Sequence, residues 1–239
     1  MSLLSWRPQV RNLKSQFINL VFPPVCVHCG KVGALICEDC LAMVAWVEAP
    51  VCAKCGRPVG KPTQQCAVCR KRPLPLKQIR AALLFKTIVP DMIHHLKYRN
   101  AFALAEPLGD MMAQAWPQWQ THVDLVLPIP LHAKRRKKRG YNQSELLVNQ
   151  LCLSLSTTTE KHLLQRTRHT PPQVGLNAAD RQTNVKGAFS VTDREKVKGR
   201  EILLVDDVVT TGATLKAAAD ALTAAGAKSV SAYCLARAL

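Results

Sequence analysis

The sequence predicts an α/β protein with a parallel sheet, preceded by a small metal-binding module. Short apolar runs without polar alternation lie at 79–85, 123–127, 202–205 and 229–235, and such runs are typical of parallel strands covered on both faces. Helical patterns separate several of these runs, as expected of an α/β fold. Eight of the ten cysteines form C-x2-C pairs within residues 26–69, a spacing that favours metal binding in a cytosolic chain.

The composition is that of a globular but strongly basic protein. With 239 residues, of which 48% are hydrophobic, the chain can form one α/β core plus a smaller module. Its 33 Lys and Arg against 16 Asp and Glu give a formal charge of +17, which is expected to attract nucleic acid first and anionic membrane second. No stretch resembles a transmembrane helix or a signal peptide. We therefore expect a cytoplasmic protein, and association with a membrane surface stays open.

The first 24 residues predict a basic amphipathic helix that ends at the prolines in positions 23–24. Apolar side chains recur at helical spacing, with Arg7, Arg11 and Lys14 between them. We interpret this segment as a helix that packs on its own protein. Docking on a membrane surface is the alternative.

The four cysteine pairs form two units, each with a C-x2-C-G sequence followed by a second pair. Two cysteines separated by two residues can bind one tetrahedral Zn²⁺ ion, and the glycine frees backbone N–H groups to hydrogen-bond the thiolates. We predict two four-cysteine zinc sites in a module at 25–72, which are either purely structural or in contact with nucleic acid. Pairing of neighbours is the simplest arrangement, and crossed pairing stays open. The predicted ligands are Cys26, Cys29, Cys37, Cys40, Cys52, Cys55, Cys66 and Cys69.

The rest of the chain, 73–239, is expected to form the α/β domain. Its strand at 123–127 runs into a P-I-P-L loop, and six consecutive cations follow at 134–139. Such a run repels itself unless an anion or solvent screens it, so it is interpreted as a polyphosphate or nucleic-acid contact, with a solvated surface as the alternative. Helices are expected at 102–116 and 145–155, and a polar, Pro/Gly-punctuated loop at 166–189 is expected to be functional or mobile.

The most informative stretch lies near the end of the chain. The apolar run at 202–205 ends in Asp206 and Asp207, and a T-T-G-A-T loop leads into a helix at 214–225. Such a loop lies at the carboxyl end of the sheet, where open α/β folds bind ligands. Backbone N–H groups at 211–214 can hold a phosphate, and the carboxylates suit hydroxyls or a Mg²⁺-bound group. A phosphate beside a diol describes a phosphorylated ribose.

This stretch resembles the 5-phosphoribosyl-1-pyrophosphate (PRPP) motif of the type I phosphoribosyltransferases. The chain as a whole resembles the ComF family of ComFC-type competence proteins. The motifs that match this family occur in its order: the cysteine pairs, Leu96-Lys97, L-P-I-P at 127–130, R-G-Y-N-Q at 139–143, R-T at 166–167, and V-D-D-V-V-T-T-G-A-T at 205–214. Tyr141 departs from the family pattern, in which phenylalanine is common at this position.

The resemblance implies a type I phosphoribosyltransferase-like sheet with an N-terminal double zinc ribbon. It also implies a hood over the site, for which 79–100 is our candidate. The implied partners are PRPP with Mg²⁺, single-stranded DNA taken up during natural transformation or used as a nutrient, and DNA-uptake machinery at the inner face of the membrane. Whether the protein is a phosphoribosyltransferase that turns over PRPP or a binding module without turnover stays open. Base salvage is a weaker third interpretation, because it needs neither the zinc module nor the cationic run.

The expected roles follow from these motifs. Asp206 and Asp207 orient the ribose and act in catalysis. The 5-phosphate site is formed by Thr210, Thr211, Gly212, Ala213 and Thr214, and the pyrophosphate loop by Pro128, Ile129, Pro130 and Leu131. The expected anion- or DNA-binding residues are Lys97, Arg135, Arg136, Arg139, Asn142, Gln143, Arg166 and Arg181.

Overall fold

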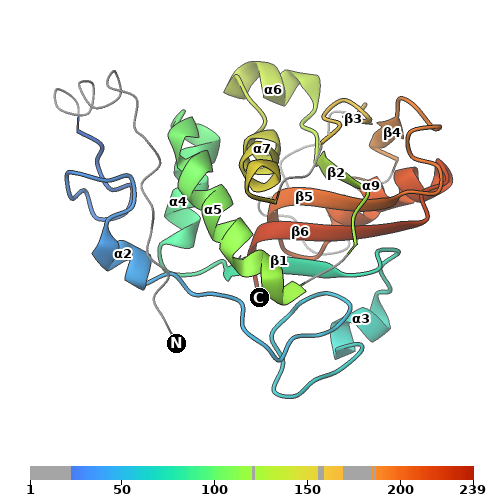
Figure 1. Ribbon diagram of the computed structural model, residues 1–239, viewed down its shortest axis with the longest axis horizontal. Helices are drawn as coiled ribbons and strands as arrows, with labels where there is room; N and C mark the ends of the chain where they lie inside the picture. Colours follow the sequence, from blue (N-terminus) through green and yellow to red (C-terminus); the bar gives the residue numbers. More distant parts are fainter. Residues whose placement is uncertain (1–22, 120–121, 156–158, 169–184, 186) are drawn as a thin grey trace. The chain divides into compact units, whose positions relative to one another are not determined.

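A computed structural model describes residues 23–119, 122–155, 159–168, 185 and 187–239 (Figure 1). The expected amphipathic helix at the N-terminus lies outside these described residues, apart from its last two positions, and so do Arg181 and most of the polar loop. The chain divides into two compact units, Met1–Met43 and Val44–Leu239. Each unit is described by itself.

The first unit contains the first four cysteines and one short helix. Its knuckle closes through backbone hydrogen bonds from Cys26 N to Lys31 O (2.9 Å) and from Gly30 N to Cys26 O (3.0 Å). Gly30 has a left-handed backbone, with φ at 78°. Helix α2, Glu38–Ala42, begins directly after Cys37 and buries Cys40.

The second unit is built on a four-stranded sheet with the order β1-β6-β5-β2, and all three strand pairs are parallel. The strands are β1 (Ile79–Leu84), β2 (Leu125–Pro128), β5 (Glu201–Val209) and β6 (Ser229–Arg237). The α/β fold with a parallel sheet is confirmed. Strand β5 continues four residues beyond the apolar run at 202–205, because β6 pairs with it as far as Val209. A separate antiparallel pair joins β3 (Leu164–Arg166) to β4 (Phe189–Val191).

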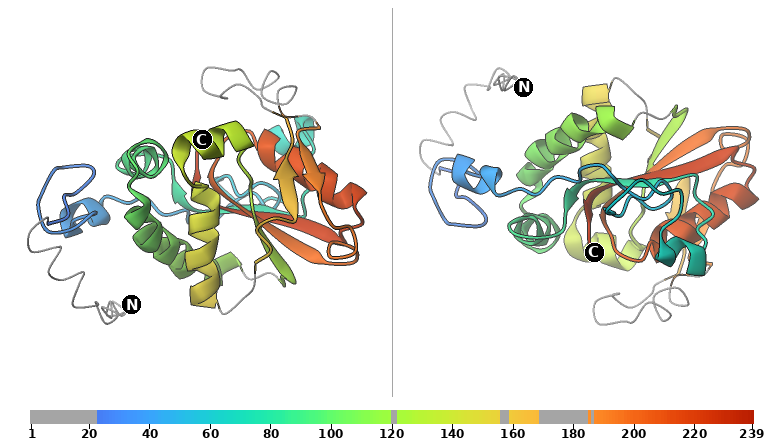
Figure 2. Two further views of the ribbon diagram at one scale, coloured as in Figure 1. Left: turned by 90° about the horizontal axis from the view of Figure 1, so that it is seen from above. Right: turned by 90° about the horizontal axis from the view of Figure 1, so that it is seen from below.

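Helices cover both faces of the sheet (Figures 1 and 2). On one face, α5 (Ala105–Ala115) packs against α7 (Gln143–Leu155), and both contact the strands. On the other face, α9 (Ala213–Ala224) contacts β6 and β4. Gly226, with φ at 98°, follows the α9 C-cap, Ala225. The core is the apolar layer between these helices and the strands.

The remaining helices of the second unit are short and include one that the sequence did not predict. The cationic run forms α6, Ala133–Arg139. His132 Nδ1 accepts a hydrogen bond from the Lys134 N–H at its start, and left-handed Gly140 ends it. The other short elements are α3 (Ala67–Lys71), α4 (Val89–Tyr98), η1 (Phe102–Leu104) and η2 (Trp116–Trp119).

The second cysteine cluster belongs to the same unit as the sheet. Residues 45–47 hydrogen-bond to β1, through Val47 N to Ala82 O (2.9 Å) and Leu84 N to Ala45 O (2.7 Å). Ile79 N also donates to Lys54 O at 2.9 Å. The approach is close at Gly56, where an added Cβ would lie 2.5 Å from the Ile79 carbonyl oxygen. The glycine of this repeat is therefore required for docking on the sheet.

The hood candidate at 79–100 is divided between two layers. Its first part is edge strand β1 of the central sheet, because the apolar run pairs in parallel with β6. Its second part is α4, which ends at Tyr98 beside the cavity described below. Of these two parts, only α4 contributes residues to the lining of the cavity.

Candidate functional site

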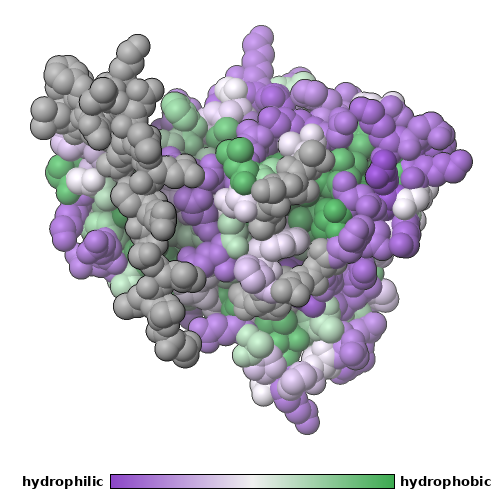
Figure 3. Space-filling model, viewed as in Figure 1, coloured by the Kyte–Doolittle hydropathy of each residue, from purple (hydrophilic) through white to green (hydrophobic). Residues whose placement is uncertain are grey.

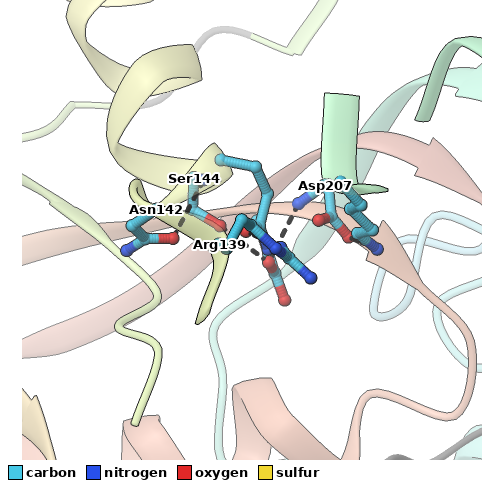
Figure 4. A network of polar contacts seen from close by, with 7 residues as sticks. Arg139, Asn142, Ser144 and Asp207 are labelled. Carbon is cyan, nitrogen blue, oxygen red and sulfur yellow. Dashed lines mark hydrogen bonds and ion pairs between the residues drawn. The ribbon is translucent and has the colours of Figure 1, made fainter. Parts of the chain in front are cut away.

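The two aspartates lie within β5 rather than after it. Consecutive strand residues point to opposite faces, and the two side chains have different partners here. Ser144 Oγ, at the start of α7, donates a hydrogen bond to Asp206 Oδ1 at 2.9 Å. Lys97 Nζ, near the end of α4, lies 2.7 Å from Asp207 Oδ1. The acids thus join β5, α7 and α4 at the carboxyl end of the sheet. Figure 4 shows Ser144 and Asp207 within this network of polar contacts.

The environment of Asp206 disfavours its charged form. Burial, together with the neighbouring Asp207 carboxylate, raises the pKa of Asp206 to about 7, although Lys97, the Asp207 backbone N–H and the Ser144 hydroxyl favour ionisation. Asp206 therefore titrates near neutral pH. The pair has the unequal environments that are common in sites that bind or transfer charge.

One carboxylate oxygen of Asp207 is buried without a donor from the described residues. Asp207 is only 4% exposed, and its Oδ2 has no hydrogen-bond partner among the described residues. A buried acceptor without a donor is costly, so this oxygen suits a ligand hydroxyl or a hydrated cation. The residues present therefore fit the expected Mg²⁺–phosphosugar group, since Mg²⁺ prefers carboxylate, phosphate and water oxygens.

The predicted phosphate loop connects β5 to α9. Gly212 is the helix N-cap with φ at 79°, a left-handed conformation that other residues rarely adopt. Thr211 Oγ1 accepts a long hydrogen bond, 3.4 Å, from the Ala213 N–H. The first turn of this 12-residue helix has backbone N–H groups without intrahelical partners, which is the arrangement that binds anions. Thr210 and Thr214 line the adjacent cavity.

The predicted pyrophosphate loop is tied to both neighbouring elements. Pro128 ends β2, and Ile129 N donates to Val205 O of β5 at 2.9 Å. Asn142 Nδ2 donates to Ile129 O at 3.0 Å, and its Oδ1 accepts from Ser144 N at 3.2 Å. Asn142 is 1% exposed. Asn142 was expected to bind an anion, and in the structure its side chain hydrogen-bonds to the loop and to the start of α7.

These elements surround a cavity of about 510 Å³. Both aspartates, Thr210, Thr214 and loop residues 129–131 line it. The expected anion-binding residues that also line it are Lys97, Arg135, Arg139, Gln143 and Arg166. The structure thus brings most of the predicted site together from α4, the loop after β2, α6, α7, β3, β5 and the start of α9.

The cations around this cavity are held in different ways. Arg136 does not line it and instead forms a two-bond ion pair with Glu145. Arg139 donates a hydrogen bond to Gln143 Oε1. Burial lowers the pKa of Arg166 to about 10, and Arg135 adds to this effect, so Arg166 stays charged at neutral pH. An anion in the cavity would offset this crowding of positive charge.

Two residues that the sequence analysis did not assign complete the geometry. Ser144 holds Asp206, and its only signal in the sequence is its position after the R-G-Y-N-Q segment. The Tyr141 hydroxyl donates to the Leu96 carbonyl, which ties the start of α7 to the end of α4. The tyrosine that departs from the family pattern therefore has a partner that phenylalanine could not have.

The eight cysteines form two separate groups of possible metal ligands. Cys26, Cys29, Cys37 and Cys40 form one, and Cys52, Cys55, Cys66 and Cys69 form the other, with the Sγ atoms of each group within 4.8 Å of one another. The neighbouring pairing is thus the one found. Although burial opposes ionisation, backbone N–H groups lower the pKa of Cys26 and of Cys52 to about 6. Thiolates held this way suit Zn²⁺.

A buried arginine supports a metal in the second group. Arg237, at the end of β6, is 4% exposed, and its Nε and Nη1 atoms have no hydrogen-bond partner among the described residues. Burial lowers the pKa of Arg237, while Cys55 and Cys69 act in the opposite direction. Four thiolates around Zn²⁺ carry a net charge of −2 and accept hydrogen bonds. The second cluster would therefore offset this buried positive charge.

Comparisons with known proteins match this arrangement. A double zinc ribbon domain matches residues 17–71, and a phosphoribosyl transferase domain matches residues 125–239. The chain is 31% identical over 229 residues to the DNA utilization protein YhgH of Salmonella typhi. The alignment covers 92% of this chain and all of that protein. It is 30% identical over 225 residues to Competence protein F of Haemophilus influenzae, covering 89% and 96%.

Among solved structures, glutamine PRPP amidotransferase from B. subtilis, complexed with ADP and GMP, is 22% identical. The match covers 54% of this chain and has a TM-score of 0.37; this chain spans 25% of that protein's length.

The fold and the domain match together define residues 125–239 as a phosphoribosyltransferase-type domain, and the cysteine-rich part as a double zinc ribbon. The chain aligns with YhgH and Competence protein F over nearly the full length of each protein. The chain belongs to the ComF family of competence and DNA utilization proteins.

Proposed function

We propose that this protein binds Mg²⁺-PRPP at the carboxyl end of its sheet and handles single-stranded DNA during DNA uptake or DNA utilisation. The observation that supports the first half most directly is the cavity that Asp206 and Asp207 share with Thr210 and Thr214. Carboxylates for a diol and a helix N-terminus for a phosphate are both present there. The names of the relatives support the second half.

In the proposed complex, each part of the phosphosugar has its own contacts. The 5-phosphate accepts hydrogen bonds from backbone N–H groups at 211–214. The free Oδ2 of Asp207 accepts from a ribose hydroxyl, and Asp206, held by Ser144, stays directed at the sugar. The pyrophosphate lies along the loop at 128–131, where Arg135 and Arg139 face it.

If the bound PRPP reacts, these residues act mainly by position and charge. The leaving pyrophosphate gains negative charge while the anomeric carbon becomes positive. Arginines around the loop stabilise the first change and the aspartates stabilise the second. Mg²⁺, held by PRPP and the Asp207 side, would supply charge neutralisation of the leaving group. Residues of β5, α7 and α9 would hold PRPP in the position that the reaction requires.

A binding module without turnover is the second candidate, and one contact favours it. Lys97 already occupies Asp207 Oδ1 at 2.7 Å, although the two residues are 110 positions apart. A lysine in this place neutralises the acid before any ligand binds. In a sensing protein, PRPP would bind beside this ion pair, and no transfer need follow.

No helix in the described part of the chain has the length and apolarity needed to span a bilayer. We propose that the protein meets DNA-uptake machinery at the inner face of the membrane, where the basic surface would follow the incoming strand.

The two candidates separate in one experiment. The full chain is incubated with Mg²⁺-PRPP and a panel of free bases and oligodeoxynucleotides, and pyrophosphate release is measured, with the Asp206→Asn/Asp207→Asn variant as background. Release above this background with one acceptor class identifies a transferase and its acceptor. Binding of PRPP without release identifies a binding module. Absence of both would refute the proposed function.

A further inference from the structure

Two large aromatic side chains near the end of α4 are exposed to solvent, and one of them lines the cavity. Tyr98, the last residue of α4, is 61% exposed, and Phe102, the first residue of η1, is 64% exposed. Aromatic side chains usually bury most of their surface in a core. Tyr98 also lines the cavity that contains the two aspartates. A binding role would explain why both rings stay exposed at this position.

Flat groups from two helices gather around Tyr98. The ring centroid of His94, one turn earlier on α4, lies 5.1 Å from that of Tyr98. The Arg139 guanidinium of α6 lies 5.2 Å from the Tyr98 centroid. We name these three residues, together with the exposed Phe102 four positions after Tyr98, the aromatic rim. Aromatic rings and guanidinium planes are the surfaces on which unpaired bases stack.

The cations next to this rim are available to phosphates. Lys134, Lys137 and Lys138 of α6 are exposed, and none of them has an ion-pair partner among the described residues. Hydrophilic side chains gather over α6 in the space-filling view (Figure 3). Lys138 and Arg139 line the cavity together with Tyr98. Flat rings beside lysines without ion-pair partners suit a ligand that carries both bases and phosphates.

The pattern fits a single strand better than other polyanions. In a duplex the bases already stack on one another, so their faces are not available to side chains. A lipid headgroup offers the phosphate without a flat group for His94 and Tyr98. We propose that the aromatic rim is a stacking platform for the bases of single-stranded DNA, whose phosphates lie along α6. The platform rests on the proposed function and extends it, because it holds one base at the mouth of the phosphoribose cavity.

The test measures binding of base-bearing and abasic strands to the full chain. Fluorescence anisotropy follows a labelled oligothymidylate and an abasic oligomer with the same number of phosphates. The wild type is expected to bind the oligothymidylate about 10-fold more tightly or better, as stacking of one or two bases requires. The Tyr98→Ala/Phe102→Ala variant is expected to lose this preference and to keep its affinity for the abasic oligomer. An oligouridylate measured in parallel compares RNA with DNA.

Matched variants separate the platform from general charge. Tyr98→Phe keeps the ring and should keep the preference for bases. Lys134→Gln/Lys137→Gln should weaken both oligomers alike and lower the salt dependence of binding. The substituted residues Tyr98, Phe102, Lys134 and Lys137 are all exposed. The circular dichroism spectrum and zinc content of each variant should therefore match those of the wild type.

Three outcomes would overturn the proposal. If the wild type binds both oligomers equally and the double alanine variant behaves the same, the stacking platform is refuted. The proposal that the protein binds DNA would then still stand. A wild type that binds neither oligomer removes the DNA part of the proposed function as well. Binding to anionic phospholipid vesicles that is lost in the double alanine variant, without any preference for bases, would assign the rim to a membrane instead.

Discussion

At the scale of single residues, the site depends on two adjacent aspartates with unequal surroundings. Asp207 has a cationic partner in Lys97, at 2.7 Å. Asp206 has a hydroxyl partner, Ser144, and the like charge of its neighbour. A carboxyl whose pKa is raised in the folded state costs stability when it ionises. The negative charge of Asp206 therefore destabilises the folded protein.

This cost gives a pH dependence with a definite sign. The folded pKa of Asp206 is about 7 and its ordinary value is 3.8, so its contribution to the free energy of unfolding falls as pH rises between them, by up to about 1.4 kcal/mol per pH unit. Asp206→Asn removes the charge and keeps an acceptor oxygen. We expect this variant to unfold at a higher temperature than the wild type near pH 8, with a gain that shrinks as the pH falls towards 4.

Asp124→Asn is the matched control, with the opposite sign. Asp124 Oδ2 accepts a hydrogen bond from the Glu201 N–H at 2.8 Å, and this bond lowers the pKa of Asp124. Its carboxylate stabilises the fold above its ordinary pKa, so the asparagine variant should lose stability at neutral pH. Thermal unfolding across the pH range measures both variants. A gain for Asp206→Asn that does not change with pH would contradict the account.

At the scale of elements, the two cysteine units repeat in sequence but differ in structure. Each has glycine after its first pair, at Gly30 and Gly56, and both glycines are left-handed, with φ at 78° and 69°. Nothing lies within 4 Å of a Cβ added at Gly30, whereas one added at Gly56 would meet the backbone of β1 at 2.5 Å. The second cluster is therefore part of the unit that contains the sheet.

Matched alanine substitutions test this difference. Each alanine incurs left-handed backbone strain of about 1–2 kcal/mol. Gly56→Ala adds a backbone clash that costs about 1–3 kcal/mol or more, so it should lower the melting temperature of the whole domain far more than Gly30→Ala does. Differential scanning calorimetry of the zinc-loaded chain measures both. Equal losses for the two variants would show that the second cluster does not depend on contact with β1.

At the scale of the whole molecule, local patterns were predictable and long-range contacts were not. The acids and the T-T-G-A-T loop could be placed from the sequence because a buried strand, a turn and a helix follow one another along the chain. The sequence did not predict α6, since six cations argue against a helix and the caps His132 and Gly140 are needed to explain it. The contact between Lys97 and Asp207 spans 110 residues, and no local periodicity reports it.

The cysteine pattern shows the same limit. Its spacing predicted two sites of four ligands, and the two Sγ groups are found. No local pattern indicated that the second cysteine cluster docks on β1 through backbone hydrogen bonds, or that Arg237 lies buried near the thiols of this cluster. Both features depend on the tertiary fold. Exposure of Tyr98 and Phe102 was equally unpredictable, since an aromatic residue in an apolar helical pattern is usually part of a core.

The central claim is that the carboxyl end of β5 binds PRPP, and isothermal titration calorimetry with Mg²⁺-PRPP tests it most directly. The wild type should bind, and Asp206→Asn/Asp207→Asn should lose binding, since both carboxylates that face the cavity become neutral. Asp220→Asn is the control, because Asp220 is an exposed residue of α9 that pairs with Lys216, and it should bind like the wild type. Unchanged affinity in the double asparagine variant would contradict the account.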